Sequence, residues 1–437
     1  MIHRRQESSS VSTSSTARRL PVLAAALSLA AAGLAAAQPA EARTPHCPQL
    51  TISAGWYGDN QTRLQELIDT YGTCGAGAGH GKKPVAVFDW DNTVVKNDVG
   101  DATMYWLLRH SKIQRPVRGD WHTTSRYLTD DAAASLATAC PAGRSTTLPT
   151  ATDTRCADEI LAVYGEGRTG KGAPAFAGYD RRTIEPSYAW LAQLLHGWSP
   201  AQVRAFASAA RAENLNAPAD AVQTVGSNTK ATAWVRYYDQ QRDLIRTLKK
   251  AGFDVWITSA SPEPVVDAWA RGAGVDPDHA IGIRSTTEHG RLTSHLKGCG
   301  AAKDGDDSMI TYIDGKRCWI NQEIFGVRGA AAEKVQPAAR RQVFAAGDSD
   351  TDVSFLRDAT GLRLVLNRNK NELMCRAYDD SDGRWIVNPM FIEPKGRKAA
   401  PYPCATTGYT DHDGTPAPVR RADGSVVPNQ RDSVYGG

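Results

Sequence analysis

Four short, mainly apolar runs recur along the chain, and segments with helical spacing separate them. The runs are Val85 to Phe88, Phe253 to Ser259, Val343 to Ala346 and Leu362 to Leu366. Runs of this kind are typical of strands that are buried on both faces of a parallel sheet. The order of strand, helix and strand predicts right-handed crossovers and a doubly wound, Rossmann-like α/β sheet.

The segment before the second run is amphipathic. Leu244, Ile245 and Leu248 fall on one face of a helix that we predict over Asp239 to Ala251, and Gly252 stands where that helix would end. The helix and the strand that follows it therefore form one crossover unit of the predicted sheet.

About 150 residues separate the first two runs, whereas a crossover needs only about a dozen. An additional domain must therefore be inserted between the first strand and the second. We predict a mainly helical cap over residues 99–238.

The amino terminus has the pattern of an export signal. Arg18 and Arg19 precede an apolar run from Leu20 to Ala37, and small residues follow up to Ala42. We expect cleavage after Ala42, with Ala37 as the alternative site, and a secreted or extracytoplasmic mature chain without stable membrane insertion. An uncleaved anchor is the other interpretation, which the Ala-rich composition of the run disfavours.

These patterns divide the chain into five predicted parts. They are a signal peptide over 1–42, an N-terminal helical segment with a Gly-rich linker over 43–83, a core over 84–98 and 239–398, the cap over 99–238, and an irregular tail over 399–437.

All eight cysteines lie beyond the predicted cleavage site, and an even count in an exported chain favours disulfides. They are Cys47, Cys74, Cys140, Cys156, Cys299, Cys318, Cys375 and Cys404. Pairing of neighbours would close four loops, but the sequence leaves the connectivity open. A zinc site is the alternative, which the absence of any Cys-x-x-Cys pair disfavours.

Charge and composition exclude several classes of protein. Hydrophobic residues make up 41% and charged residues 22%, which are ordinary globular proportions. The formal net charge of +4 falls to +2 when the four basic and two acidic residues of 1–42 are removed. With no basic run interleaved with aromatic residues, we expect no nucleic-acid partner. The oligomeric state stays open.

Two carboxylates follow the first predicted strand, in the segment Asp89-Trp90-Asp91-Asn92-Thr93. In an extended segment, the side chains of Asp89 and Asp91 point in the same direction. One carboxylate can attack phosphorus, while a protonated neighbour donates to the leaving oxygen and later deprotonates water. Taken alone, the pattern also suits a solvated turn.

The segment that follows the second strand, Ile257 to Glu263, offers an anion site. Ser261 is suited to cap a helix whose first residue is Pro262. Backbone N–H groups beside Ala260 and the Ser259 hydroxyl could then bind a phosphoryl group. A helix cap without any ligand is the alternative interpretation.

Acidic residues follow the third strand, from Asp348 to Asp352, and could complete an oxygen-rich site with Asp89. Mg²⁺ prefers such hard ligands. Upstream, Lys334 could neutralise the nucleophile and a phosphate oxygen. A lone lysine is usually a solvated surface residue, so only its position before the third strand favours Lys334.

In their order along the chain, the motifs FDWDNT, ITSASPE, EKV and AAGDSDTD resemble those of the haloacid dehalogenase superfamily, in particular its phosphoserine phosphatase-like branch, here in an exported form. The resemblance covers about residues 84–368. It implies a Mg²⁺-dependent hydrolase of phosphoric monoesters, a phosphatase that acts through an aspartyl phosphate.

The resemblance also implies a role for each residue of the first two motifs. Asp89 would be the nucleophile and a Mg²⁺ ligand. Asp91 would be the general acid and base, and its backbone carbonyl would bind the metal. Thr93 would support this loop and contribute to phosphate binding, while Ser259, with the backbone at Ala260, would bind the phosphoryl group.

The remaining roles fall on the last two motifs. By the same resemblance, Lys334 would hold the phosphoryl group against Asp89, and Asp348 would be the third protein ligand of the metal. Asp352 would orient Lys334 or a metal-bound water. Whether Asp350 or Asp352 matters more is left open.

Three rival functions remain. A carbon–halide hydrolase needs no acid, so Asp91 argues against it. A phosphomutase would lack its usual cytosolic metabolites outside the cell. A non-catalytic secreted binding protein would not need the full acidic set.

The sequence of the cap leaves the substrate open, and we expect a small phosphate monoester. Phosphoserine suits the resemblance, whereas a phosphocholine-like ester would suit cap aromatics that could enclose a quaternary ammonium. Examples of such residues are Tyr105, Trp106, Tyr188 and Trp190.

Overall fold

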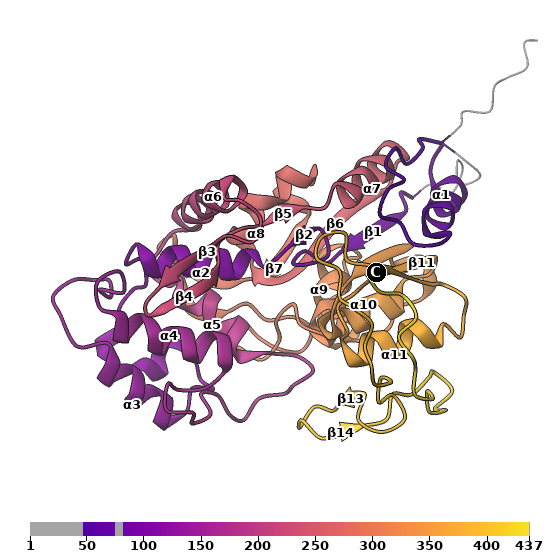
Figure 1. Cartoon of the computed structure of the whole chain (residues 1–437). Coiled ribbons are helices and arrows are strands. Elements are labelled where there is room, and N and C mark those ends of the chain that lie inside the picture. Colours follow the sequence, from indigo (N-terminus) through magenta and orange to yellow (C-terminus); the bar gives the residue numbers. More distant parts are fainter. Residues whose placement is uncertain (1–46, 75–81, 437) are drawn as a thin grey trace, which may run out of the picture. The chain divides into compact units, whose positions relative to one another are not determined.

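A computed structural model of the chain describes residues 47–74 and 82–436 (Figure 1). The predicted signal peptide and most of the predicted Gly-rich linker lie outside these residues. Every helix in the described ranges is too short or too polar to cross a bilayer.

Six parallel strands form the central sheet, in the order β12-β11-β10-β1-β6-β7. Their bounds are β1 Val85–Phe88, β6 Asp254–Pro262, β7 Ala280–Ile283, β10 Phe344–Gly347, β11 Leu362–Asn367 and β12 Trp385–Pro389. The four predicted strands are among them, while β7 and β12 were not predicted. The arrangement confirms the α/β class with a parallel, doubly wound sheet.

Alternate side chains of the strands enter two separate hydrophobic clusters, one on each face of the sheet. In β1, Ala86 and Phe88 belong to the first cluster and Val87 to the second. Because side chains of a strand point alternately to its two faces, this division means that both faces are buried. It explains why the strands have continuous apolar runs.

Three helices cover each face of the sheet. Helices α1, Asn60–Tyr71, α7, Asp239–Lys250, and α8, Glu263–Ala270, contribute to the first cluster. Helices α9, Asp314–Glu323, α10, Val353–Asp358, and α11, Asn371–Asp379, contribute to the second. The predicted helix at 239–251 is thus α7, with Leu244, Ile245 and Leu248 on its buried face.

A large insertion follows β1 and returns before α7. The strands β2, Val95–Lys96, and β5, Arg236–Tyr237, pair at its two ends. Between them lie α2 Val99–Arg109, α3 Asp130–Ala139, α4 Thr154–Glu166, α5 Pro186–Leu194 and α6 Pro200–Asn216, with a hairpin of β3 Val222–Val225 and β4 Asn228–Thr232. The side chains of this insertion belong to the first cluster, so its interior is continuous with one face of the sheet.

A second, smaller insertion was not predicted. The hairpin of β8, Ser285–Glu288, and β9, Arg291–Leu296, follows β7 and contacts the large insertion. Gln193 Nε2 donates a hydrogen bond of 3.0 Å to the Ser294 carbonyl, and the Gly197 N–H donates one of 2.8 Å to Leu292. This hairpin therefore extends the large insertion, although we had assigned its residues to the core.

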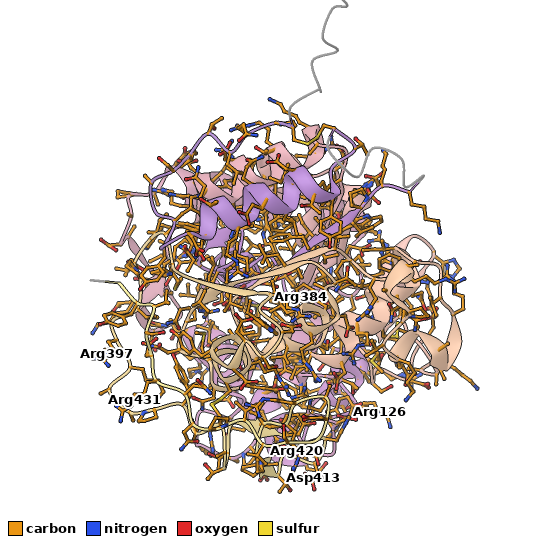
Figure 2. All side chains as sticks on the ribbon, turned by 90° about the vertical axis from the view of Figure 1, so that its right-hand side faces the viewer. Arg126, Arg384, Arg397, Asp413, Arg420 and Arg431 are labelled. Atoms are coloured by element: carbon orange, nitrogen blue, oxygen red, sulfur yellow. A yellow bond between two sulfur atoms is a disulfide. The ribbon has the colours of Figure 1, made fainter. Side chains whose placement is uncertain are left out.

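The C-terminal segment has little regular structure, but it is packed onto the core. It contains only the short strands β13, Tyr409–Thr410, and β14, Pro416–Ala417. Tyr402 and Val419 are fully buried in the second cluster. Exposed arginines project from the same segment, among them those labelled in Figure 2: Arg397, Arg420 and Arg431.

Neighbouring cysteines pair along the chain, so that the four disulfides close four short loops. The pairs are Cys47–Cys74, Cys140–Cys156, Cys299–Cys318 and Cys375–Cys404. Because disulfides persist in oxidising compartments, four such pairs suggest an extracytoplasmic environment.

Candidate active site

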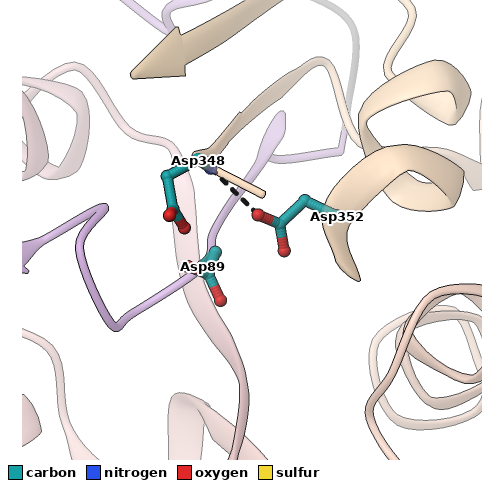
Figure 3. A group of neighbouring side chains, drawn as sticks. All are labelled: Asp89, Asp348 and Asp352. Atoms are coloured by element: carbon teal, nitrogen blue, oxygen red, sulfur yellow. Dashed lines mark hydrogen bonds between the residues drawn. The ribbon is translucent and has the colours of Figure 1, made fainter. Parts of the chain in front are cut away.

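Three predicted aspartates meet at the carboxyl ends of β1 and β10 (Figure 3). Asp89 follows β1 and Asp348 follows β10, and the two strands pair in register. Asp352 accepts hydrogen bonds through Oδ2 from the N–H groups of Asp348, at 2.9 Å, and Ser349, at 3.1 Å. One oxygen of each aspartate lies within 4.8 Å of the others, and all three are buried. The parallel sheet thus joins two distant acidic motifs.

The close approach of Asp352 depends on Gly347. A Cβ atom at Gly347 would lie 2.7 Å from Asp352 Oδ2, a distance that real Cβ atoms essentially never show. The glycine of the motif therefore leaves space for the carboxylate that folds back onto the end of β10.

The site contains a lysine that sequence reasoning missed. Lys316 Nζ lies 2.6 Å from Asp89 Oδ1 and 2.6 Å from Asp352 Oδ1, and the lysine side chain is fully buried. Lys316 lies in the first turn of α9. Ile313, directly before this helix, has a φ of 41°, a strained value for a β-branched residue. Its N–H donates to the Thr351 carbonyl at 3.0 Å, which ties the start of α9 to the Asp352 loop.

Lys334 was predicted to lie beside Asp89, but Lys316 occupies that position instead, and we correct the prediction accordingly. The Lys334 side chain is exposed at the end of the short 3₁₀ helix Gly329–Glu333. The sequence showed only that Lys334 precedes the third strand. It did not show that the segment around Lys334 leaves this side chain on the surface. A sequence signal for Lys316 did exist, because Trp319 and Ile320 share its helical face and are buried.

Asp91 is held by donors on both oxygens. Its Oδ1 accepts a hydrogen bond of 2.7 Å from the N–H of Val99, and its Oδ2 lies 2.9 Å from Ser261 Oγ and 3.3 Å from Ser259 Oγ. Burial, followed by the charge of Asp98, raises the pKa of Asp91 well above its usual range. A carboxyl group with a raised pKa keeps its proton to a higher pH, which suits it to act as a general acid.

The predicted phosphate-binding segment is present, but its members differ in accessibility. Ser259 is fully buried, and its Oγ accepts a hydrogen bond of 3.1 Å from the Ser261 N–H. Ala260 and Ser261 line the cavity described below. The role of Ser259 therefore stays a prediction, and Ser261 joins it as a candidate contact.

Burial has the largest single effect on the pKa values of Asp89 and Lys316. It raises the pKa of Asp89 to about 6, against the lowering effect of Lys316 and with a further rise from Asp348. Burial alone would lower the pKa of Lys316, but Asp352 and Asp89 outweigh it and raise that pKa. The lysine therefore remains charged.

The donor set fits a divalent cation. Thr93 Oγ1 lies 2.9 Å from Asp89 Oδ2 and 3.1 Å from Asp348 Oδ1. A hydroxyl has a single proton and cannot donate to both carboxylates at once. Two buried carboxylate oxygens thus share one weak donor, and a hard cation such as Mg²⁺ would neutralise both.

Asp350 and Asp352 have different hydrogen-bond partners, which indicates different roles. Both oxygens of Asp352 are occupied, by Lys316 on one side and by backbone N–H groups on the other. Asp350 instead accepts a hydrogen bond of 2.9 Å from the Leu373 N–H at the start of α11. Asp352 therefore anchors the lysine, and Asp89 and Asp348 are the two carboxylates of the cluster that would be left to hold a metal ion. The predicted backbone ligand at Asp91 stays a prediction.

Arg368 is a second cation at the site that the motifs did not reveal. It directly follows β11, and its Nη1 donates to Asp348 Oδ2. The charge of Asp348 has the largest effect on Arg368 and raises its pKa. Loss of solvation is the second effect and acts in the opposite direction.

A cavity of about 1380 Å³ lies over these residues. Among its lining side chains are Asp89, Asp91, Asp348, Arg368 and Ser261, together with Tyr105, Tyr188, Asp98 and Asp101 of the large insertion. Trp106 and Trp190, which the sequence also suggested for substrate contact, are core residues. Trp190 is fully buried, and Trp106 stacks on His110 with ring centroids 4.0 Å apart.

The fold and the family comparison agree. The six-stranded parallel sheet with helices on both faces is a haloacid dehalogenase-like α/β fold. Residues 146–357, a little under half of the chain, match the family model for haloacid dehalogenase-like hydrolases, so this part of the chain is similar to a hydrolase domain of that kind. The matched range contains Ser259, Lys316, Asp348 and Asp352 and begins after Asp89. None of the curated proteins matches this chain.

Several solved structures are similar to the chain at low identity. A conserved, functionally unknown protein from Anaerococcus prevotii is 17% identical, with a TM-score of 0.49, over 77% of this chain and 93% of its own. A protein of unknown function from Bordetella pertussis is 18% identical, with a TM-score of 0.42, over 71% and 99%. A substrate-bound phosphoserine phosphatase is 15% identical, with a TM-score of 0.31, over 65% and 86%.

Proposed function

We propose that the chain is an exported, Mg²⁺-dependent phosphomonoesterase that hydrolyses a small phosphorylated metabolite through an aspartyl phosphate on Asp89. The observation that carries this proposal is the fully buried Lys316, which lies between Asp352 and Asp89, and Asp89 lines a large cavity. Burying a charged pair costs desolvation energy. A pair of apolar residues in the same place would often stabilise the fold just as much. Perturbed charges gathered in a cleft therefore favour a catalytic role.

In the first half of the reaction, the Asp89 carboxylate attacks phosphorus. A bond forms between an Asp89 oxygen and phosphorus while the bond from phosphorus to the ester oxygen breaks. Asp91 transfers its proton to that ester oxygen, so a neutral alcohol leaves. Lys316 offsets the charge of Asp89, which allows an anionic phosphate ester to approach a carboxylate.

In the second half, water releases the phosphate. Asp91, now ionised, takes a proton from water as the water oxygen bonds to phosphorus and the bond to Asp89 breaks. Inorganic phosphate leaves, Asp89 is restored and Asp91 is protonated again. A divalent ion held by Asp89 and Asp348 would supply positive charge to the phosphoryl oxygens during both steps.

The wall of the cavity supports a polar substrate. Tyr105 and Tyr188 line it beside Asp98 and Asp101. Neither aspartate forms a salt bridge within the described residues, although the charge of Arg368 acts on Asp98. Aromatic faces and carboxylates attract a cationic group. We therefore keep phosphoserine-like and phosphocholine-like esters, which both carry a positively charged nitrogen, as the substrate classes to test.

The test measures phosphate release from a panel of small monoesters, with Mg²⁺ or with EDTA. The wild-type chain is compared with Asp89→Asn and with Asp69→Asn, a control on the exposed side of α1. We expect metal-dependent turnover that Asp89→Asn abolishes and Asp69→Asn retains. Turnover that persists in Asp89→Asn would reject Asp89 as the nucleophile. A folded wild-type chain that releases no phosphate from any ester would favour a binding function.

A further inference from the structure

We propose that Arg368 binds the phosphoryl group of the substrate, and the released phosphate, in the active-site cavity. The inference rests on the proposed phosphomonoesterase activity and adds a residue that lies outside the four sequence motifs. Arg368 follows β11, the strand next to β10, and therefore reaches the site from the side of Asp348.

The guanidinium group has donors to spare. Its Nη1 binds Asp348 Oδ2, while Nε and Nη2 make no hydrogen bond to any other residue in the described ranges. The side chain is 28% exposed and lines the cavity that also contains Asp89. The planar fork of an arginine matches two oxygens of a phosphate. The free edge of Arg368 is therefore suited to bind an oxyanion.

The backbone on both sides of Arg368 is anchored. Asn367 Nδ2 donates to Asp432 Oδ1 at 3.0 Å, and the Tyr402 hydroxyl donates to Asn369 Oδ1 at 2.8 Å. Asn369 adopts a φ of 60°, which asparagine tolerates better than most residues. The C-terminal segment thus supports the loop that presents Arg368, so the guanidinium starts from a well-fixed position.

Arg368 also improves the charge balance of the site. Three buried carboxylates, from Asp89, Asp348 and Asp352, lie there with the half-buried Asp91, and Lys316 binds two of them. With Asp91 protonated, as the general acid must be when the ester binds, Lys316 offsets only one of the three remaining negative charges. The charge of Arg368 offsets a second, which reduces the repulsion that a phosphate ester meets beside these carboxylates.

The test measures the affinity for inorganic phosphate by calorimetry at saturating Mg²⁺, which requires no turnover. The variants are Arg368→Gln and, as a matched control, Lys370→Gln. Lys370 lines the same cavity from the same loop but is exposed. We expect Arg368→Gln to weaken phosphate binding by about 10- to 100-fold, as for a lost charge-assisted hydrogen bond. Lys370→Gln should weaken it by less than about threefold.

Arg368→Lys protects the test against misfolding, because it keeps a charge beside Asp348 but lacks the fork. We expect native thermal unfolding and an intermediate loss of phosphate affinity. Equal losses in Arg368→Gln and Lys370→Gln would show only a general effect of charge and would overturn the proposal. So would phosphate affinity in Arg368→Gln that equals wild type, even where the wild-type chain hydrolyses esters. A loss that appears only below saturating Mg²⁺ would mean that Arg368 acts through the metal site, which also overturns the proposal.

Discussion

Lys316 Nζ lies 2.6 Å from Asp89 Oδ1, although 227 positions separate the two residues in the chain. Both side chains are buried, and Asp352 holds the same ammonium group from the other side. Three separate segments of the chain therefore supply this group of charges: the end of β1, the first turn of α9 and the loop after β10. Loss of any one partner leaves a buried charge without its counterion, which is strongly unfavourable.

Replacement of Lys316 by Met should reduce phosphomonoester turnover by at least about 100-fold, because it removes the fixed charge that offsets Asp89. Lys334→Met is the matched control, and it should retain activity within about twofold since its side chain is exposed. Steady-state kinetics on the best ester of the panel would measure both. Comparable losses in the two variants would reject the reassignment of the site lysine.

Asp352→Asn and Asp350→Asn should differ in effect, although the residues are two positions apart. Asp352 holds Lys316 through one oxygen, so its amide variant should lower kcat by about 10- to 100-fold. Asp350 accepts from the backbone of α11, and asparagine can still accept there, so we expect a change below about threefold. Measured kcat values in the reverse order would assign the anchoring role to Asp350.

Stability should depend on pH through Asp98. Burial, then the charge of Asp101, raises the pKa of Asp98 to about 7. The folded chain therefore binds a proton that the unfolded chain has released, and stability falls as the pH rises from about 4 to about 7. Asp98→Asn removes this loss and keeps an acceptor for the Asp101 N–H at the start of α2.

We expect Asp98→Asn to be more stable than wild type by roughly 1–3 kcal/mol above pH 7, with a difference that vanishes near pH 4. Thermal unfolding across this pH range measures it. Asp131→Asn, on the exposed side of α3, should stay within about 0.5 kcal/mol of wild type throughout. A constant difference at all pH values would attribute the effect to helix capping instead.

Arg182 should be important for stability, because it joins the large insertion to the core. Its Nη1 lies 2.7 Å from Glu372 Oε2, and its carbonyl accepts a hydrogen bond of 2.9 Å from the Asp314 N–H at the start of α9. Arg182→Gln should destabilise the chain by about 3–5 kcal/mol. Arg155→Gln removes an exposed ion pair with Asp153 and should cost less than about 1 kcal/mol. Urea unfolding midpoints of the two variants would compare them, and equal midpoints would contradict this view of Arg182.

Sequence patterns alone predicted four of the six strands of the sheet and part of the site. The four apolar runs located β1, β6, β10 and β11, because a strand buried on both faces needs apolar residues at every position. Asp89, Asp91, Asp348 and Asp352 could be proposed from the same patterns, since ligands bind where parallel strands end.

The remaining features depend on contacts between segments that are far apart in the chain. Lys316 and Lys334 both precede β10, and only burial of the α9 face places the first of them beside Asp89. Arg368 joins the site because β11 lies next to β10. The hairpin β8–β9 and the buried Tyr402 lacked a periodic apolar pattern, because irregular segments pack through isolated side chains. Local sequence records the face that an element buries, whereas the identity of its neighbour arises only when the chain closes on itself.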